Sequence, residues 1–143
     1  MKIDWTHIAI HQSATPDGDE LDFDNFRRYH IQDRLWKDVG YNYGVDRVHQ
    51  DYEVVVGRPL TMTGAHAIGW NDRAIGIVYA GNYNLAPPPL EMLQVSVYRL
   101  IKPLMVYHDI TKDRIVGHKD TQRPGYTECP GRLFNMERLR DLI

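Results

Sequence analysis

Five segments of the chain have the pattern of β-strands, with short runs of β-branched or apolar residues: Thr6 to Ile10, Tyr41 to Val48, Glu53 to Val56, Ala74 to Ala80 and Arg114 to Gly117. The fourth, AIGIVYA, is an almost unbroken apolar run, which is typical of a strand buried on both faces. The second and third are expected to form a hairpin around His49-Gln50-Asp51, although this turn lacks the glycine that tight hairpins prefer. The first strand is expected to end at His11.

Apolar residues at helical spacing predict three helices: Asp22 to Trp36, Leu90 to Tyr107 and Phe134 to Ile143. The second has the clearest apolar stripe, and Pro103 should bend it or end its regular part. A length of 143 residues is usual for one domain. The order of strands and helices therefore predicts an α/β fold. We expect a single domain over residues 1–143, with a central mixed β-sheet flanked by about three α-helices.

Composition and charge argue against several classes of function. The net charge is −2, and Lys and Arg are scattered among Asp and Glu, so we expect no nucleic-acid partner. No apolar stretch approaches the roughly 20 residues that cross a bilayer, so we expect no membrane partner. The single cysteine cannot form an internal disulfide. No apolar segment typical of a signal peptide follows the N-terminus, so we expect a protein made in the cytosol without one.

Three residues with metal-binding side chains fall near predicted strand ends. His11 ends the first strand, His118 follows the last one, and Cys129 lies in the loop after it. They could therefore converge at one edge of the sheet, and three protein ligands with an open fourth position are typical of a catalytic zinc site. The residue types alone leave a plainer interpretation open. In it, both histidines are hydrogen-bonded polar residues and Cys129 is a small buried apolar side chain.

Four segments carry a resemblance to a known family, in order along nearly the whole chain. They are IAIHQSAT (Ile8 to Thr15), GYNYGVDR with YEVVVGRP (Gly40 to Pro59), GAHAIGWND with AIGIVYAGNYN (Gly64 to Asn84), and VGHKD with ECPG (Val116 to Gly131). Together they resemble the amidase-2 and peptidoglycan-recognition-protein family, which also includes phage amidases similar to T7 lysozyme.

The resemblance implies both an activity and a site. The family hydrolyses the amide between the lactyl group of N-acetylmuramic acid and the L-alanine of the peptidoglycan stem peptide. His11, His118 and Cys129 match the ligands of its single Zn²⁺ ion, and a Cys at the third position favours an active enzyme. Tyr41 matches the tyrosine beside the metal-bound water, and Thr127 falls where relatives carry Lys or Thr. Both are expected to be catalytic residues.

Other side chains are candidates for substrate contact. His66 lies in a glycine-flanked loop, and Trp36 and Trp70 could line a groove for sugar or peptide. Each tryptophan could equally be a packed anchor, Tyr41 could pack as an ordinary strand residue, and Thr127 could only stabilise its loop. Because position 127 is Thr rather than Lys, the proton for the leaving amine would come from His66 or Tyr41.

The expected partner is peptidoglycan, cleaved in the cell wall (periplasm) by a monomeric enzyme after the membrane has been permeabilised. The chain lacks the paired cysteines of many animal relatives, which fits a phage or bacterial lytic enzyme. Two alternatives stay open. One is a non-catalytic peptidoglycan-binding protein of the same fold. The other, if the chain comes from a phage, is a protein that binds and regulates RNA polymerase.

Overall fold

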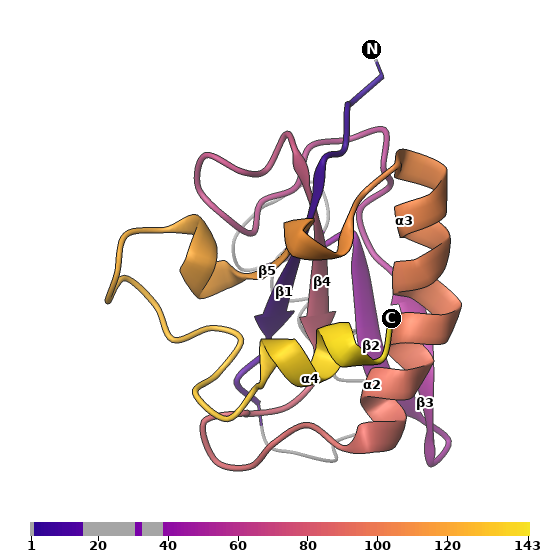
Figure 1. Ribbon diagram of the computed structural model, residues 1–143, viewed down its shortest axis with the longest axis vertical. Coiled ribbons are helices and arrows are strands. Elements are labelled where there is room, and N and C mark those ends of the chain that lie inside the picture. The colour runs from indigo at the N-terminus through magenta and orange to yellow at the C-terminus, as the bar shows by residue number, and fades with distance from the viewer. Residues whose placement is uncertain (1, 16–30, 33–38) are drawn as a thin grey trace.

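A five-stranded mixed sheet forms the centre of the computed structural model, which describes residues 2–15, 31–32 and 39–143. Its strands are β1 (His7–Gln12), β2 (Tyr43–Val48), β3 (Asp51–Val56), β4 (Ala74–Tyr79) and β5 (Ile115–Gly117), in the order β3-β2-β4-β1-β5. β2, β4, β1 and β5 are parallel, and β3 pairs antiparallel with β2 at one edge (Figure 1). This arrangement confirms the predicted α/β fold with a mixed sheet.

The hairpin between β2 and β3 turns through His49 and Gln50 alone. Val48 pairs with Asp51, so the turn has two residues rather than the three expected from the sequence. Both turn residues have positive φ, 51° and 71°, although neither is glycine. Two successive positive φ values match the right-handed twist of the paired strands, so the tight hairpin form is kept.

The long helix of the chain is continuous but irregular. It consists of α2 (Leu90–Ser96), the π-helical segment η2 (Val97–Ile101) and α3 (Lys102–His108). Pro103 directly follows the start of α3, where its missing N–H and its ring disturb the preceding turn, and a π-helical turn accommodates this. The predicted disturbance at Pro103 is therefore confirmed as a widening of the helix.

Further short helical elements among the described residues are η3 (Lys112–Arg114), η4 (His118–Thr121) and α4 (Met136–Asp141). α4 begins later than the predicted Phe134, because the side chain of Asn135 accepts a hydrogen bond from the backbone N–H of Arg138 and caps the helix. The predicted helix Asp22 to Trp36 lies almost wholly outside the described residues. Among the described residues, no helix has the length and apolar character needed to cross a bilayer.

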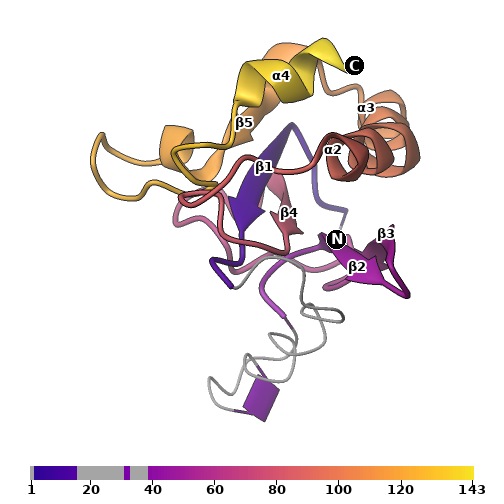
Figure 2. The same cartoon turned by 90° about the horizontal axis from the view of Figure 1, so that it is seen from below.

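α2, α3 and α4 pack on one face of the sheet (Figure 2). All six residues of β4, which lies between β2 and β1, are buried, as its apolar run predicted. The core joins the sheet to these helices and contains Ile8, Ile10, Ile75, Ile77, Met92, Leu93, Val97, Ile101, Phe134 and Leu139. Each such side chain contributes about 1.5–3 kcal/mol by leaving water, and together they hold the strand ends in place.

Asn42 fastens the segment before β2 to the centre of the sheet. It is fully buried; its Oδ1 accepts a hydrogen bond from the N–H of Gly76 at 2.9 Å, and its Nδ2 donates to the carbonyl of Arg58 at 3.2 Å. Its own backbone N–H donates to the carbonyl of Gly76 at 3.0 Å. The neighbouring Tyr41 is thereby held at the sheet.

We predict that Asn42→Ala lowers the free energy of unfolding by about 2–4 kcal/mol, because two buried backbone groups lose their partners. Urea denaturation measures the change. Gln94→Ala, which removes an exposed amide from α2, is the control and should stay within about 0.5 kcal/mol of the parent. An Asn42→Ala variant as stable as this control would show that the buried amide does not fasten the sheet.

Candidate metal centre

His11, His118 and Cys129 converge at one edge of the sheet. β1 and β5 are parallel neighbours, so His11 near the end of β1 and His118 directly after β5 come to the same edge. One ligand atom from each of the three residues lies within 4.8 Å of the others. His11 is buried, and His118 and Cys129 are half-buried. The predicted convergence of the three residues is confirmed.

Cys129 is held in this position from two sides of its loop. Its carbonyl accepts a hydrogen bond from the N–H of Lys119 at 2.8 Å, and its Sγ accepts one from the N–H of Gln12 at 3.4 Å. Thr127 Oγ1 accepts a hydrogen bond from the N–H of Cys129 at 3.1 Å. Thr127 therefore stabilises the loop, and its hydroxyl hydrogen has no partner among the described residues.

The spacing of the donor atoms fits a tetrahedral metal ion. The Sγ of Cys129 lies 3.7 Å from the Nδ1 of His11. Usual Zn–S and Zn–N bond lengths with tetrahedral angles place two such ligands about 3.6 Å apart. Two imidazole nitrogens and one thiolate are also a donor set that suits Zn²⁺. The three residues could thus hold one ion with its fourth position open.

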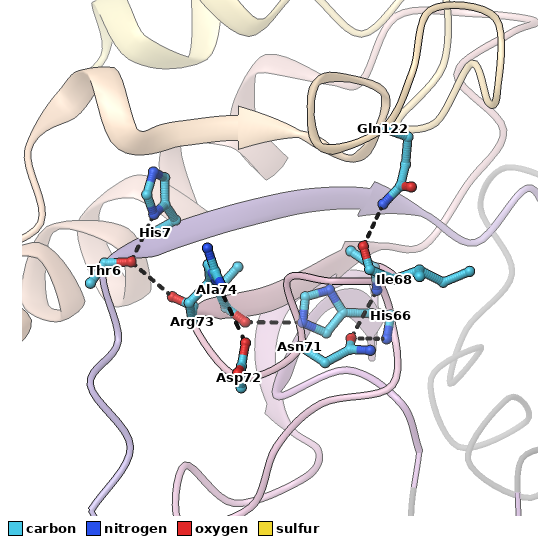
Figure 3. Close-up of polar contacts among 10 residues, drawn as sticks. Thr6, His7, His66, Ile68, Asn71, Asp72, Arg73, Ala74 and Gln122 are labelled. Carbon is cyan, nitrogen blue, oxygen red and sulfur yellow. Dashed lines mark hydrogen bonds and ion pairs between the residues drawn. The ribbon is translucent and has the colours of Figure 1, made fainter.

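His66 lies directly behind His11. Its Nδ1 is 2.9 Å from the Nε2 of His11. Its Nε2 is 3.0 Å from the carbonyl oxygen of Ala74 (Figure 3). The ring is buried and perpendicular to that of His11, with centroids 4.9 Å apart. Both ring nitrogens are therefore engaged inside the protein. Neither nitrogen is left to form a hydrogen bond with a substrate, but the ring still lines the cavity beside the triad, so substrate contact by His66 stays a prediction.

Tyr41 lies beside His11, as expected for a residue of the site. Its ring centroid is 5.2 Å from that of His11, and it packs against Val39 and Val78. Its carbonyl accepts a hydrogen bond from the N–H of Arg58 at 2.8 Å, which fixes the backbone before β2. The phenol is thereby placed next to the triad.

Of the two tryptophans predicted to line a groove, only Trp70 is among the described residues. Trp36 lies outside the described residues. Trp70 packs edge-on against His7, with centroids 4.9 Å apart, at the start of β1 and so about 13 Å of strand away from His11. This contact agrees with the alternative expectation of a packed anchor.

A cavity of about 300 Å³ opens beside the triad. His66 and His118 line it, together with Ile68 and the partly exposed Tyr126, and Trp70 is not among the described residues around it. The side chain of Gln122 donates to the carbonyl of Ile68 at 2.9 Å and so joins the loops that carry the two walls (Figure 3). Ile68 and Tyr126 were not predicted from the sequence, because single apolar residues in loops have no periodicity to mark them.

Known proteins of similar sequence identify the family of the chain. The Amidase_2 family, described as N-acetylmuramoyl-L-alanine amidase, matches residues 1–132. The chain belongs to this family. Peptidoglycan-recognition protein LB of Drosophila melanogaster is 30% identical to it over 136 residues, which are 90% of this chain and 56% of the relative. The chain thus spans little more than half the length of that relative.

Two solved structures show the same fold in this family. The endolysine N-acetylmuramoyl-L-alanine amidase LysCS from Clostridium intestinale URNW has a TM-score of 0.78 and 26% identity, covering 98% of this chain and 84% of that one. A point mutant of Drosophila PGRP-LB in complex with tracheal cytotoxin has a TM-score of 0.77 and 27% identity, covering 96% and 81%. The resemblance expected from the four sequence segments is confirmed.

Burial keeps the site of this amidase-2 domain electrically neutral near pH 7. It lowers the pKa of His11 well below its usual value, with His66 and His118 adding to the effect, and it lowers the pKa of His118 as well. Burial also lowers the pKa of His66 to about 4 and raises that of the Cys129 thiol to about 11. The imidazoles are therefore unprotonated and the thiol is protonated in the metal-free site.

We predict that the affinity for Zn²⁺ or Co²⁺ rises about tenfold per pH unit between pH 7 and 9, because the ion must displace one proton from Cys129 while the histidines carry none. Competition with a chromogenic chelator at several pH values measures the slope. In Cys129→Ala the affinity should be weak and nearly independent of pH. A flat profile in the parent protein would contradict a protonated thiol at the site.

Proposed function

We propose that this amidase-2 domain is a zinc-dependent N-acetylmuramoyl-L-alanine amidase. It hydrolyses the amide between the lactyl group of N-acetylmuramic acid and the L-alanine of the peptidoglycan stem peptide. The observation that carries the proposal is the convergence of His11, His118 and Cys129 in a chain of this family. Two relatives support the substrate class: LysCS is named as an endolysine amidase, and PGRP-LB was solved with tracheal cytotoxin.

His11, through Nδ1, together with His118 and Cys129 would hold one Zn²⁺ ion per chain. Bound there, the ion supplies a Lewis acid for the scissile carbonyl and makes hydroxide available at neutral pH. Cys129 is also the feature that favours an enzyme over a binding protein, because active relatives have a Cys or Asp at this position.

The reaction breaks the C–N bond of the amide. The oxygen of water joins the lactyl carbonyl carbon, and the nitrogen of L-alanine gains a proton. Tyr41 has a pKa raised by burial, and the nearby Cys129 adds to the effect, so its phenol stays protonated and can donate a hydrogen bond to the carbonyl oxygen as that atom becomes negative. Both ring nitrogens of His66 are engaged, so we assign delivery of the proton to Tyr41 rather than to His66. As the C–N bond breaks, the phenol would pass its proton to the leaving nitrogen and regain one that the attacking water loses, so the proton gained by the amine comes in the end from water.

The cavity between His66 and His118 is where we place the part of the substrate next to the scissile bond. Its apolar walls, Ile68 and Tyr126, suit the methyl groups that flank this amide in the lactyl group and in L-alanine. We further propose that the domain acts on the cell wall as a lytic enzyme of phage or bacterial origin. Binding of RNA polymerase and a monomeric state stay predictions.

The bond that is cleaved can be identified in ¹⁸O-labelled water with purified peptidoglycan. We predict one labelled oxygen in the lactyl carboxylate and a new N-terminal L-alanine, both detected by mass spectrometry. Cys129→Ala should release at least about a hundredfold less product, because a ligand is lost. Glu128→Ala, an exposed neighbour, is the control and should retain activity. Zinc binding without any cleavage would instead indicate a non-catalytic peptidoglycan-binding protein, and label elsewhere would indicate a different hydrolase.

The role of the phenol can be tested separately from metal binding. Tyr41→Phe should lower kcat by about 10²–10³-fold, the usual loss when one donor to a developing oxyanion is removed, and leave zinc content unchanged. Steady-state kinetics on a soluble muropeptide separates kcat from KM. Tyr43→Phe, on the strand that follows, is the control and should keep the parent kcat. An unchanged kcat in Tyr41→Phe would remove Tyr41 from the reaction.

A further inference from the structure

The hydrogen bonds around His66 have a single possible direction. The carbonyl oxygen of Ala74 can only accept, so the Nε2 of His66, 3.0 Å away, must carry a hydrogen. In a neutral ring the Nδ1 of His66 can then only accept, and it receives the hydrogen of the His11 Nε2 at 2.9 Å. His11 is left with an unprotonated Nδ1, the atom that lies 3.7 Å from the Sγ of Cys129.

The ring of His66 is fixed in this orientation by its surroundings. A Cβ atom at either Gly64 or Gly76 would lie closer than 3.0 Å to the ring, so the imidazole fills a slot between two glycines. The Oδ1 of Asn71 accepts hydrogen bonds from the N–H groups of His66 at 2.7 Å and Ala67 at 2.9 Å, which holds the backbone (Figure 3). A slot built from a loop glycine and a strand glycine, with the backbone of His66 held by the half-buried amide of Asn71, indicates a required ring position rather than incidental packing.

We propose that His66 is a positioning residue that sets the ring tautomer of His11, so that the Nδ1 of His11 is presented to the metal ion. The proposal rests on the proposed function only for the presence of that ion. Histidine ligands usually donate their second ring N–H to a protein acceptor, which fixes the tautomer and orients the ring. Here the acceptor is a second histidine. The carbonyl of Ala74 on β4 orients the ring of His66, and His66 in turn orients the ring of His11 on β1.

The tautomer can be measured without any metal. Long-range ¹H–¹⁵N correlation spectra of the metal-free parent protein should show His11 protonated at Nε2 and unprotonated at Nδ1. A His11 protonated at Nδ1 would overturn the proposal with no variant needed. In His66→Phe, which keeps a flat ring but removes both nitrogens, His11 should become a mixture of the two tautomers.

Metal affinity gives the second readout. His66→Phe should bind Zn²⁺ about 10–100-fold more weakly in a chelator competition, the usual loss when such a partner is removed. His66→Gln, whose amide has an acceptor oxygen and a donor nitrogen, should recover part of the loss. His7→Phe, on the same strand as His11, is the control and should change neither readout.

The outcomes separate this inference from the proposed function. If the parent protein binds no zinc, the proposed function fails, while the tautomer spectrum of the parent still decides the role of His66. If the parent binds zinc, and His66→Phe binds it equally tightly with the tautomer of His11 unchanged, His66 is not a positioning residue and the amidase proposal stands. If His66→Phe does not fold, His66→Gln and the parent spectrum carry the test.

Discussion

The parallel pairing of β1 with β4 on one side and β5 on the other is the constraint on which the site depends. It brings the carboxyl ends of strands that are distant in the sequence to one edge of the sheet, so that Cys129 meets His11 across 118 positions of chain. The apolar core under α2 to α4 keeps these strands in register. Asn42 holds the neighbouring Tyr41 near His11, because its side chain and its backbone N–H both form hydrogen bonds with Gly76 of β4. The sheet thus fixes the position of each of these side chains.

Burial then decides the charge state of that edge. A buried environment disfavours protonated imidazoles and an ionised thiol alike, so the metal-free site holds no formal charge. A divalent ion changes this balance, because it stabilises the thiolate and takes the lone pairs that the neutral rings already offer. The same burial keeps the phenol of Tyr41 protonated. Burial therefore sets the protonation states both of the three candidate ligands and of the Tyr41 phenol.

Much of the fold was predictable, because it follows from local patterns. The apolar run AIGIVYA indicated a central strand, Pro103 indicated the disturbed helix, and a strand ending at His11 indicated a ligand at a sheet edge. The turn at His49 and Gln50 was less predictable, since its positive φ values occur without glycine. The setting of His66 depends on a carbonyl of β4 and on glycines from two segments, which only the folded chain brings together. Trp70 was uncertain for the same reason, because no local pattern shows which end of β1 it packs against.

Whether His11, His118 and Cys129 together hold one zinc ion can be measured by X-ray absorption at the zinc edge of the purified protein. We predict about one zinc per chain, with one sulfur at about 2.3 Å and the remaining nitrogen or oxygen ligands at about 2.0–2.1 Å. In Cys129→Ala the sulfur contribution should disappear. A zinc ion surrounded only by nitrogen and oxygen in the parent protein, or no bound zinc at all, would show that the three side chains do not hold zinc together.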